Sequence, residues 1–218
     1  MKINTIITVT NNPNHPGVER LTKSAEKFGW ELYVIDVQWK GFGTKLIETY
    51  NFLINNPQIE SFVFVDAHDV VVLSDPETFN SVLSWYNKEN KMLVSCEKAC
   101  WPDSSLSKQY THSDSEWKYV NSGLYYAPSD IFIKVFESSR PEYHDDDQLW
   151  LSKRYLDDKT NCKVSLDDCC SLFQSYSHIA DDDFAYRDGL LINLKTNTAP
   201  IFIHGNGRTD MTLIDQLL

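Results

Sequence analysis

The segment Phe62–Val72, FVFVDAHDVVV, decides how this chain folds. It is a run of β-branched and aromatic residues that only DAHD, at 66–69, interrupts. A run this apolar, without alternating polar residues, predicts a central strand that is covered on both faces. In an extended chain Asp66 and Asp69 would point to opposite faces. They can therefore converge on one point only if the strand ends and the chain turns at 67–68.

The two carboxylates at the end of this strand need an explanation, because an unpaired charge beside a core is unfavourable. Converging carboxylates repel each other, and a divalent cation is the usual partner that relieves the repulsion. The segment therefore predicts a metal site at Asp66 and Asp69. The alternative is a pair of solvated loop acids after a buried strand, and the DxxD spacing alone leaves both interpretations open.

The composition is that of an acidic, otherwise ordinary globular protein. The chain has 218 residues, of which 42% are hydrophobic and 23% charged, enough for one large domain or two small ones. The formal net charge of −11 argues against nucleic acid as a partner. An acidic protein that binds a phosphorylated ligand needs a local positive charge, which a metal ion supplies. The 5 cysteines lack CxxC spacing and indicate neither a zinc site nor a disulfide framework.

The N-terminal segment, MKINTIITVTNN, predicts a first strand rather than a secretory signal. No stretch approaches the length of a membrane-spanning helix. The chain as given is expected to be cytoplasmic, or to be a trimmed form of a protein of the endoplasmic reticulum lumen, and the sequence leaves both open.

Strands and helices alternate in the first half of the chain. This βαβαβαβ order predicts an α/β fold with a mostly parallel, doubly wound sheet flanked by helices. In such sheets ligands lie beyond the carboxyl ends of the strands, where Asp66 and Asp69 lie. The predicted strands are Ile3–Thr10, Glu31–Asp36, Ser61–Asp66 and Met92–Cys96, and the predicted helices are Gly17–Phe28, Thr44–Leu53 and Asp75–Tyr86.

The second half is less regular. A polar loop with scattered aromatic residues is expected at Ala99–Trp117, and a loop of that length is usually functional. The helix His144–Tyr155 begins with three aspartates, which suit a helix dipole but exceed what capping requires. The remaining predictions are a strand at Tyr119–Ala127 interrupted at Asn–Ser–Gly, a helix at Pro128–Ser138, short strands in Lys163–Phe173, Leu190–Leu194 and Ile201–His204, a C-terminal helix at Met211–Leu218, and one domain over residues 1–218.

The segment Ile201–Asp210, IFIHGNGRTD, again places a polar residue after an apolar strand. His204 can offer a neutral imidazole nitrogen to a metal, and Gly205 and Gly207 allow backbone amides to approach an anion. A single histidine after a strand is more often structural. Beside a DxxD, however, two carboxylates, one imidazole and a diphosphate would complete an octahedral Mn²⁺ or Mg²⁺ site.

The chain resembles the glycosyltransferase domain of the procollagen lysyl hydroxylase/glycosyltransferase family. The matching pieces run in family order over nearly the whole length: ITVT with SAEKF, WKGFGTK, FVDAHDVV, SCEKACWPD, YVNSGLYYA, HDDDQLW and IFIHGNG. The resemblance implies a GT-A fold that uses a UDP-sugar and Mn²⁺. The chain departs from the family in three ways: its Trp39–Gly43 loop is shorter, its acidic run is shorter, and Asp210 stands where the family carries a lysine near the phosphates.

The resemblance also implies a role for particular residues. Asp66, Asp69 and His204 would hold Mn²⁺, with Mg²⁺ as the alternative. His68 takes the place of an aromatic residue that stacks on uracil, and Arg208 would substitute for the missing lysine. The nucleoside and the phosphates would be bound by Thr8, Val9, Thr10, Lys45, Gln148, Gly205, Asn206 and Gly207, and the transferred sugar would be surrounded by the catalytic set Asp146, Asp147, Asn121 and Trp101.

The resemblance implies transfer of a hexose, with glucose from UDP-glucose as the expected sugar, to galactosyl-hydroxylysine of collagen or a collagen-like polypeptide, with retention of configuration. The acidic, aromatic Ala99–Trp117 loop would form the acceptor groove, or else be an exposed, solvated loop. Three alternatives are hydroxylysine galactosyltransfer from UDP-galactose, a non-catalytic UDP-sugar-binding module, and a metal-dependent phosphohydrolase.

Overall fold

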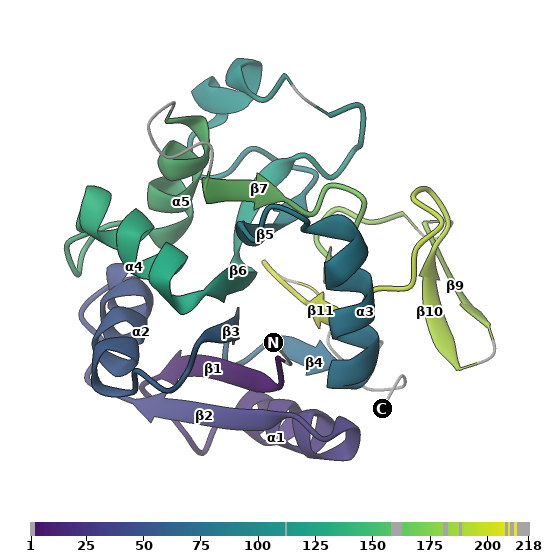
Figure 1. Ribbon diagram of the computed structural model, residues 1–218. Helices are drawn as coiled ribbons and strands as arrows, with labels where there is room; N and C mark the ends of the chain where they lie inside the picture. Colours follow the sequence, from purple (N-terminus) through teal and green to yellow (C-terminus); the bar gives the residue numbers. More distant parts are fainter. Residues whose placement is uncertain are drawn as a thin grey trace.

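A computed structural model describes residues 3–111, 113–157, 163–180, 183–187, 189–207, 209 and 212. A six-stranded sheet runs through its centre (Figure 1). In spatial order its strands are β2 (Glu31–Asp36), β1 (Thr5–Thr10), β3 (Ser61–Val65), β6 (Tyr119–Pro128), β5 (Met92–Glu97) and β7 (Val164–Leu166).

The directions of these strands make the sheet mixed. Strand β1 pairs in parallel with β2 and with β3, and β5 pairs in parallel with β7. Strand β6, in contrast, lies between β3 and β5 and is antiparallel to both. The α/β class is therefore confirmed, but the doubly wound order is broken by one inserted strand. Strand β6 runs unbroken through the predicted Asn–Ser–Gly interruption, but its pairing is interrupted there. It pairs with β3 only over Leu124–Pro128, and its register with β5 shifts between Tyr125 and Val120, opposite Val94 and Cys96.

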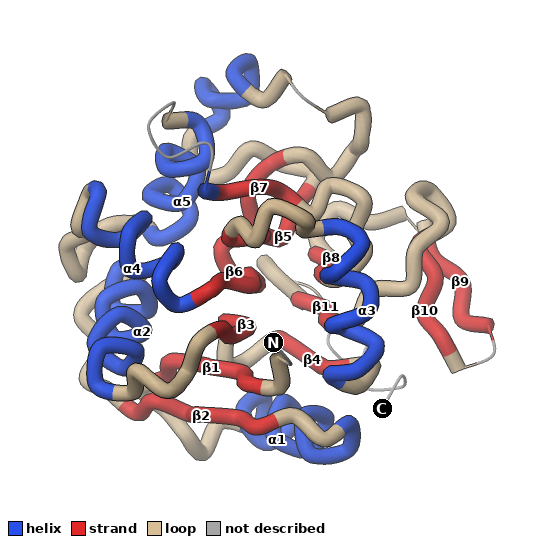
Figure 2. Tube along the Cα trace, in the orientation of Figure 1, coloured by secondary structure: helices blue, strands red, loops and turns tan. Residues whose placement is uncertain are grey.

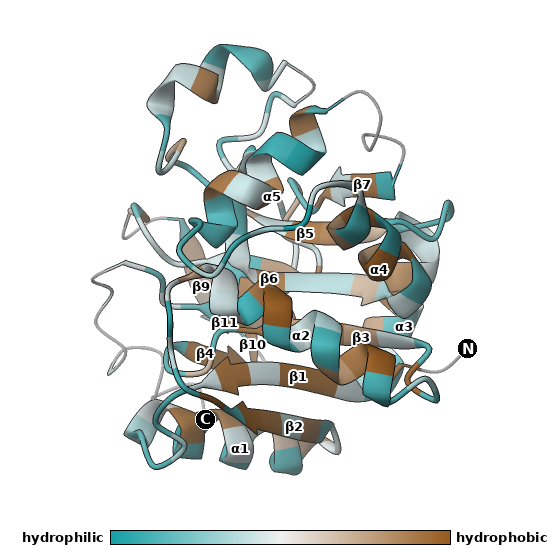
Figure 3. Ribbon diagram, turned by 90° about the vertical axis from the view of Figure 1, so that its left-hand side faces the viewer, coloured by the Kyte–Doolittle hydropathy of each residue, from teal (hydrophilic) through white to brown (hydrophobic). Residues whose placement is uncertain are grey.

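Helices cover both faces of this sheet, as Figure 2 shows. On one face, residues such as Leu46, Phe132 and Leu151 form a core with the strands. On the other face, Leu21 and Phe79 do the same. Figure 3 shows hydrophobic residues along central strands such as β1 and β5, and mixed hydrophobic and hydrophilic residues on the helices. The first face is covered by α2 (Gly43–Asn55), α4 (Ser129–Ser138) and α5 (Asp147–Leu156), and the second by α1 (Pro16–Phe28) and α3 (Pro76–Tyr86).

Local sequence explains where these helices begin and end. The side chain of Asp75 accepts a hydrogen bond from the backbone amide of Thr78 and so caps α3, with proline at the first helical position. Helix α1 ends at Gly29, whose φ of 78° is a left-handed conformation that glycine adopts without a steric penalty. Among the described residues no helix has the length and apolar character needed to cross a bilayer.

A second, three-stranded sheet positions the site. Its strands are β4 (Val70–Val72), β11 (Phe202–His204) and β8 (Phe173–Ser175), in that order. Strand β11 is antiparallel to β4 in a register that pairs His204 with Val70. Because Val70 directly follows Asp69, this pairing brings the imidazole of a distant segment beside the DAHD turn.

The remaining elements are small. The polar loop contains a 3₁₀ helix, η1 (Ser104–Gln109), and an antiparallel hairpin joins β9 (Phe184–Arg187) to β10 (Leu190–Asn193). The predicted C-terminal helix Met211–Leu218 lies outside the described residues except at 212.

Candidate metal and donor site

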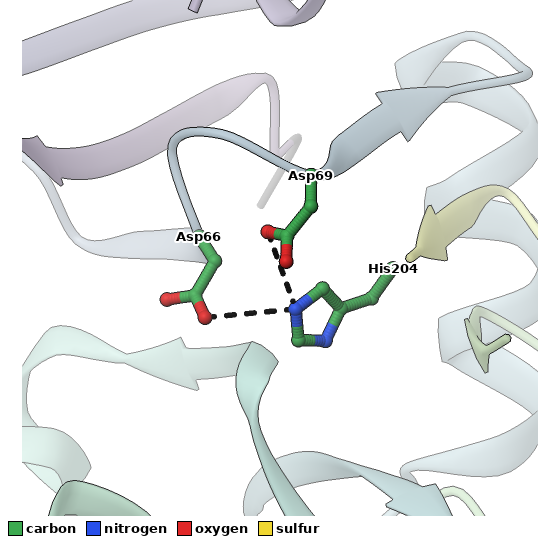
Figure 4. Close-up of side chains that lie close together, drawn as sticks. All are labelled: Asp66, Asp69 and His204. Carbon is green, nitrogen blue, oxygen red and sulfur yellow. Dashed lines mark ion pairs between the residues drawn. The ribbon is translucent and has the colours of Figure 1, made fainter. Parts of the chain in front are cut away.

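Asp66, Asp69 and His204 meet at the carboxyl end of β3 (Figure 4). His204 Nε2 lies 3.6 Å from Asp66 Oδ2 and 3.4 Å from Asp69 Oδ1. The three ligand atoms all lie within 4.8 Å of one another, so one ion could contact all of them. The expected turn at 67–68 separates β3 from β4 and allows the two carboxylates to converge.

The hydrogen bond on the far side of the imidazole fixes its orientation. His204 Nδ1 lies 2.8 Å from Asn121 Oδ1, and an amide oxygen can only accept, so Nδ1 carries the hydrogen. The neutral ring then presents the lone pair of Nε2 to the two carboxylates, as metal-binding histidines do. Asp66, Asp69 and His204 therefore have the donor chemistry of a Mn²⁺ or Mg²⁺ site.

Attraction between the imidazole of His204 and the carboxylates of Asp66 and Asp69 holds these three side chains together when no cation is bound. Burial alone would lower the pKa of His204, but the carboxylates of Asp69 and Asp66 outweigh it and raise the pKa of the imidazole above its usual value. Burial likewise acts to raise the pKa of Asp69, but the charge of His204 prevails and lowers the pKa of this carboxyl. A proton on the imidazole thus relieves the repulsion between the acids where a cation is absent.

Gly123 provides the room for the imidazole. A Cβ atom on this residue of β6 would lie 2.0 Å from Cε1 of His204, a separation that the ring cannot tolerate. Its backbone also contributes, because its amide donates to Asn121 Oδ1 and its carbonyl accepts from the amide of Asp66 at 2.8 Å. The NSG motif therefore both orients and accommodates the histidine.

Lys45 of α2 is the other positive charge at the site. Its Nζ lies 2.8 Å from Asp66 Oδ1 and 2.7 Å from Asp147 Oδ2. Burial would lower the pKa of this ammonium, but the carboxylates of Asp147 and Asp66 raise the pKa well above its ordinary value. Lys45 is therefore a permanent cation that links the predicted metal ligand Asp66 to Asp147, the first residue of α5.

The Trp39–Gly43 loop packs tightly against the segment that leads to α5. A Cβ on Gly41 would lie 2.3 Å from the carbonyl oxygen of Tyr143, and one on Gly43 would lie 2.0 Å from that of Glu142. The glycines of this loop thus permit close backbone contact. This contact fixes the entry to α2, and hence the position of Lys45.

Two adjoining pockets share the acids and Lys45. The smaller, about 310 Å³, is bounded by the end of β1, by the Trp39–Gly43 loop and by the DAHD turn. Its walls include Val9, Thr10, Asn11, Trp39, Phe42 and His68. The larger, about 430 Å³, has more carboxylate and amide side chains in its walls, which include Glu97, Trp101, Asn121, Asp146, Asp147, Gln148, His204 and Gly207.

Gln148 and Glu97 organise the floor of the larger pocket. Gln148 donates to Glu97 Oε1 and, at 3.0 Å, to the carbonyl of Trp101, while its Oε1 accepts from the amide of Ser122. Glu97 Oε2 accepts from Asn206 Nδ2 at 2.8 Å, and burial raises the pKa of this glutamate. These bonds tie the motifs that contain NSG, DDDQ and HGNG to one another.

The structure brings most, but not all, of the predicted site residues to the pockets. Thr8 lies outside both: it is buried, and its hydroxyl donates to the carbonyl of Val65 at 2.7 Å. The amide of Gly205 donates to the carbonyl of Asp69 and is therefore already engaged, which leaves Gly207 at the pocket wall. Asp146 does two things, since it caps α5 through the amide of Leu149 and also lines the larger pocket. Arg208 lies outside the described residues.

Sequence reasoning did not assign an individual role to several residues of the pocket walls, among them Asn11, Trp39, Phe42 and Glu97. For Glu97 there was a signal, because a charged residue that ends an apolar strand is the same pattern that pointed to Asp66. Asn11, Trp39 and Phe42 carried no signal of their own in the sequence, and only residues close to them in the chain, such as Thr10 and Lys45, were predicted to be site residues.

We predict that Gly123→Ala displaces the imidazole and lowers the affinity for Mn²⁺ by about ten- to a hundredfold, the usual effect of disturbing the support of a metal ligand. Calorimetric titration with Mn²⁺ measures this. In a His204→Ala background the same glycine substitution should cost no further thermal stability, because the clash is gone. Equal destabilisation in both backgrounds would contradict the steric explanation.

We also predict that Mn²⁺ affinity depends on pH through His204. The imidazolium pairs with the carboxylates, so its stabilising effect on the metal-free protein is complete below the unfolded pKa and is lost as the pH rises through the raised folded pKa. Metal must displace that proton, so affinity should fall about tenfold per pH unit below the folded pKa and level off above it. Titrations across this range with the wild type and with His204→Asn, which should lack the dependence, provide the measurement. A flat wild-type profile would remove His204 from the ligand set.

The chain is similar to known proteins over most of its length. The family model described as PLOD GT domain matches residues 2–217. The multifunctional procollagen lysine hydroxylase and glycosyltransferase of Caenorhabditis elegans is 30% identical over 93% of this chain, which spans 30% of that protein. Protein R699 of Acanthamoeba polyphaga mimivirus is 32% identical over 77% of this chain and 36% of its own length. The chain thus spans about a third of the length of these relatives.

Solved structures agree on the fold. A glycosyltransferase involved in the glycosylation of the major capsid of PBCV-1 superposes with a TM-score of 0.60 at 13% identity, over 100% of this chain and 98% of that one. Mouse xyloside xylosyltransferase 1 gives a TM-score of 0.53 at 10% identity, over 96% and 99% of the two chains. These similarities confirm the GT-A fold. The match of the family model over nearly every residue shows that this chain belongs to the PLOD glycosyltransferase domain family.

Proposed function

We propose that this protein transfers a hexose, which we assign as glucose, from a UDP-sugar to galactosyl-hydroxylysine of collagen or a collagen-like polypeptide, with retention of configuration and with Mn²⁺ as cofactor. One observation carries the proposal: Asp66 and Asp69, with His204 beside them, lie where two pockets of different chemistry adjoin. A nucleotide sugar has the same arrangement, with a diphosphate between a base and a sugar.

The smaller pocket suits the nucleoside. It combines the end of β1, including Val9 and Thr10, with the aromatic rings of Trp39 and Phe42 and the imidazole of His68. Flat heteroaromatic bases stack favourably on such rings. We therefore assign the uridine to this pocket.

The larger pocket suits the transferred sugar. Asp146, Asp147, Asn121 and Gln148 present carboxylate and amide groups, and Trp101 lies at its edge with 66% of its surface exposed. Sugars combine hydroxyl groups, which such groups bind, with apolar faces, which aromatic rings cover. Asn121 and Gln148 are hydrogen-bonded to each other at 3.4 Å and act as one positioned unit.

The charges that develop on the diphosphate and on the sugar during transfer account for the proposed roles of the remaining residues. When bound by Asp66, Asp69 and His204, Mn²⁺ supplies positive charge that stabilises the departing diphosphate. Lys45 adds a second, fixed positive charge close by, which is most effective in a partly buried site. The carboxylate of Asp147 faces the same pocket and would orient sugar hydroxyls and stabilise the positive charge that develops at the anomeric carbon.

The Ala99–Trp117 segment is the proposed acceptor surface. It contributes Ala99 and Trp101 to the pocket and then forms η1, which the side chain of Asp103 caps. The net charge of −11 favours association with a polypeptide rich in lysine and arginine. The names of the animal relatives point to collagen as such a polypeptide.

The experiment that tests the function is a panel of UDP-sugars with Mn²⁺, assayed with and without a galactosyl-hydroxylysine peptide. We expect transfer from UDP-glucose to the peptide and none after chelation of the metal. Preference for UDP-galactose on free hydroxylysine would change the donor and acceptor assigned. Tight UDP binding without transfer or hydrolysis would favour a binding module instead.

We predict that Asp147→Asn leaves the affinity for UDP within a few-fold of the wild type but lowers kcat at least about a hundredfold, since a carboxylate at the sugar is lost. Asp145→Asn is the matched control. Its carboxylate accepts from the amide of Glu142 at 2.8 Å and does not line the pocket, so turnover should stay near normal. Normal turnover of Asp147→Asn would exclude that residue from the mechanism.

A further inference from the structure

His68 lies between the two acidic ligands and is supported on one side by a second imidazole. The rings of His68 and His15 are stacked, with centroids 4.0 Å apart and an interplanar angle of 27°. Thr10 Oγ1 lies 3.0 Å from Nε2 of His68 at the ring edge. Since one face of His68 is covered by His15, the ring can offer a base only its other face, and His68 lines the smaller pocket.

The backbone of His68 is held by the start of α1 as well. Arg20 Nη2 donates to the carbonyl of His68 at 2.8 Å. Gly17 lies so close that a Cβ there would be 2.0 Å from the same carbonyl oxygen. The segment 15–20 is far from His68 in the sequence, yet it positions both the ring and the backbone of this residue.

We infer that His15 is a positioning residue for nucleotide recognition: it backs His68 and so fixes the ring on which the nucleobase stacks. The inference rests on the proposed function. An imidazole is a smaller stacking surface than a phenyl or indole ring, and it gains from being held in place before the ligand arrives, because less freedom is then lost on binding. A second ring behind it provides that preorganisation.

His15 has a competing structural role that the test must separate. Its Nδ1 accepts a hydrogen bond from the amide of Gly17 at 3.0 Å and thereby caps α1. Two substitutions divide these roles. His15→Asn keeps a side-chain acceptor for the cap but removes the ring, whereas His15→Phe keeps a ring for the stack but removes the acceptor.

The experiment compares the binding of UDP and of pyrophosphate, each with Mn²⁺, by calorimetry on the full chain. Pyrophosphate has no base, so it reports on the metal and phosphate site alone. His15→Asn should weaken UDP binding by about three- to tenfold, the range typical of an aromatic stack, and leave pyrophosphate binding within about twofold. With the donor substrate, KM should rise while kcat stays unchanged. His15→Phe should bind UDP like the wild type but melt at a lower temperature.

The control is Lys23→Ala, on the exposed side of the same helix, which should bind both ligands like the wild type. The inference is overturned if UDP binding by His15→Asn is normal, if pyrophosphate binding weakens equally, or if affinity in both His15 variants simply follows thermal stability. Failure of the wild type to bind UDP with Mn²⁺ would overturn the proposed function, and this inference with it.

Discussion

The site depends on the compensation of negative charge at the end of β3. Asp66 and Asp69 present carboxylate oxygens within 4.8 Å of each other, a separation at which two charges repel by on the order of 3 kcal/mol at an effective dielectric constant of about 20. His204 and Lys45 are the positive or proton-bearing partners that surround them. Both come from other parts of the chain. The pairing of β11 with β4 brings His204 to the acids, and the packing of α2 brings Lys45.

The short motifs of the chain acquire physical reasons from this arrangement. In NSG, asparagine orients the imidazole and glycine leaves space for it. In HGNG, the histidine faces the acids, Gly205 anchors the backbone of Asp69, and Asn206 holds Glu97. In WKGFGTK, the glycines allow the loop to pack on the segment before α5, and the lysine joins Asp66 to Asp147. The motifs are thus parts of one hydrogen-bonded network, which satisfies nearly every polar group that it buries.

This network also links the two pockets. Lys45 contacts an acid of the DAHD turn and the first residue of α5, and it lines both pockets, so the two pockets share one positive charge. Gln148 and Asn121 connect the wall of the larger pocket to His204. The short Trp39–Gly43 loop is fixed against 142–144, and its Trp39 and Phe42 line the smaller pocket. The wall of the smaller pocket is therefore held in place by contacts within the chain.

The sequence by itself determined the elements and the kind of chemistry. The apolar run at Phe62–Val65, the caps at Asp75 and Gly29, and the polar residues at strand ends are local signals, and the strands, helices and Asp–Asp–His cluster follow them. Only the tertiary structure decided the direction of β6, the place of Thr8 away from the pockets, and the roles of Glu97 and His15. The long segment between β5 and β6 allows the chain to return in either direction. A side chain's partners across the sheet depend on register, and no local pattern carries that information.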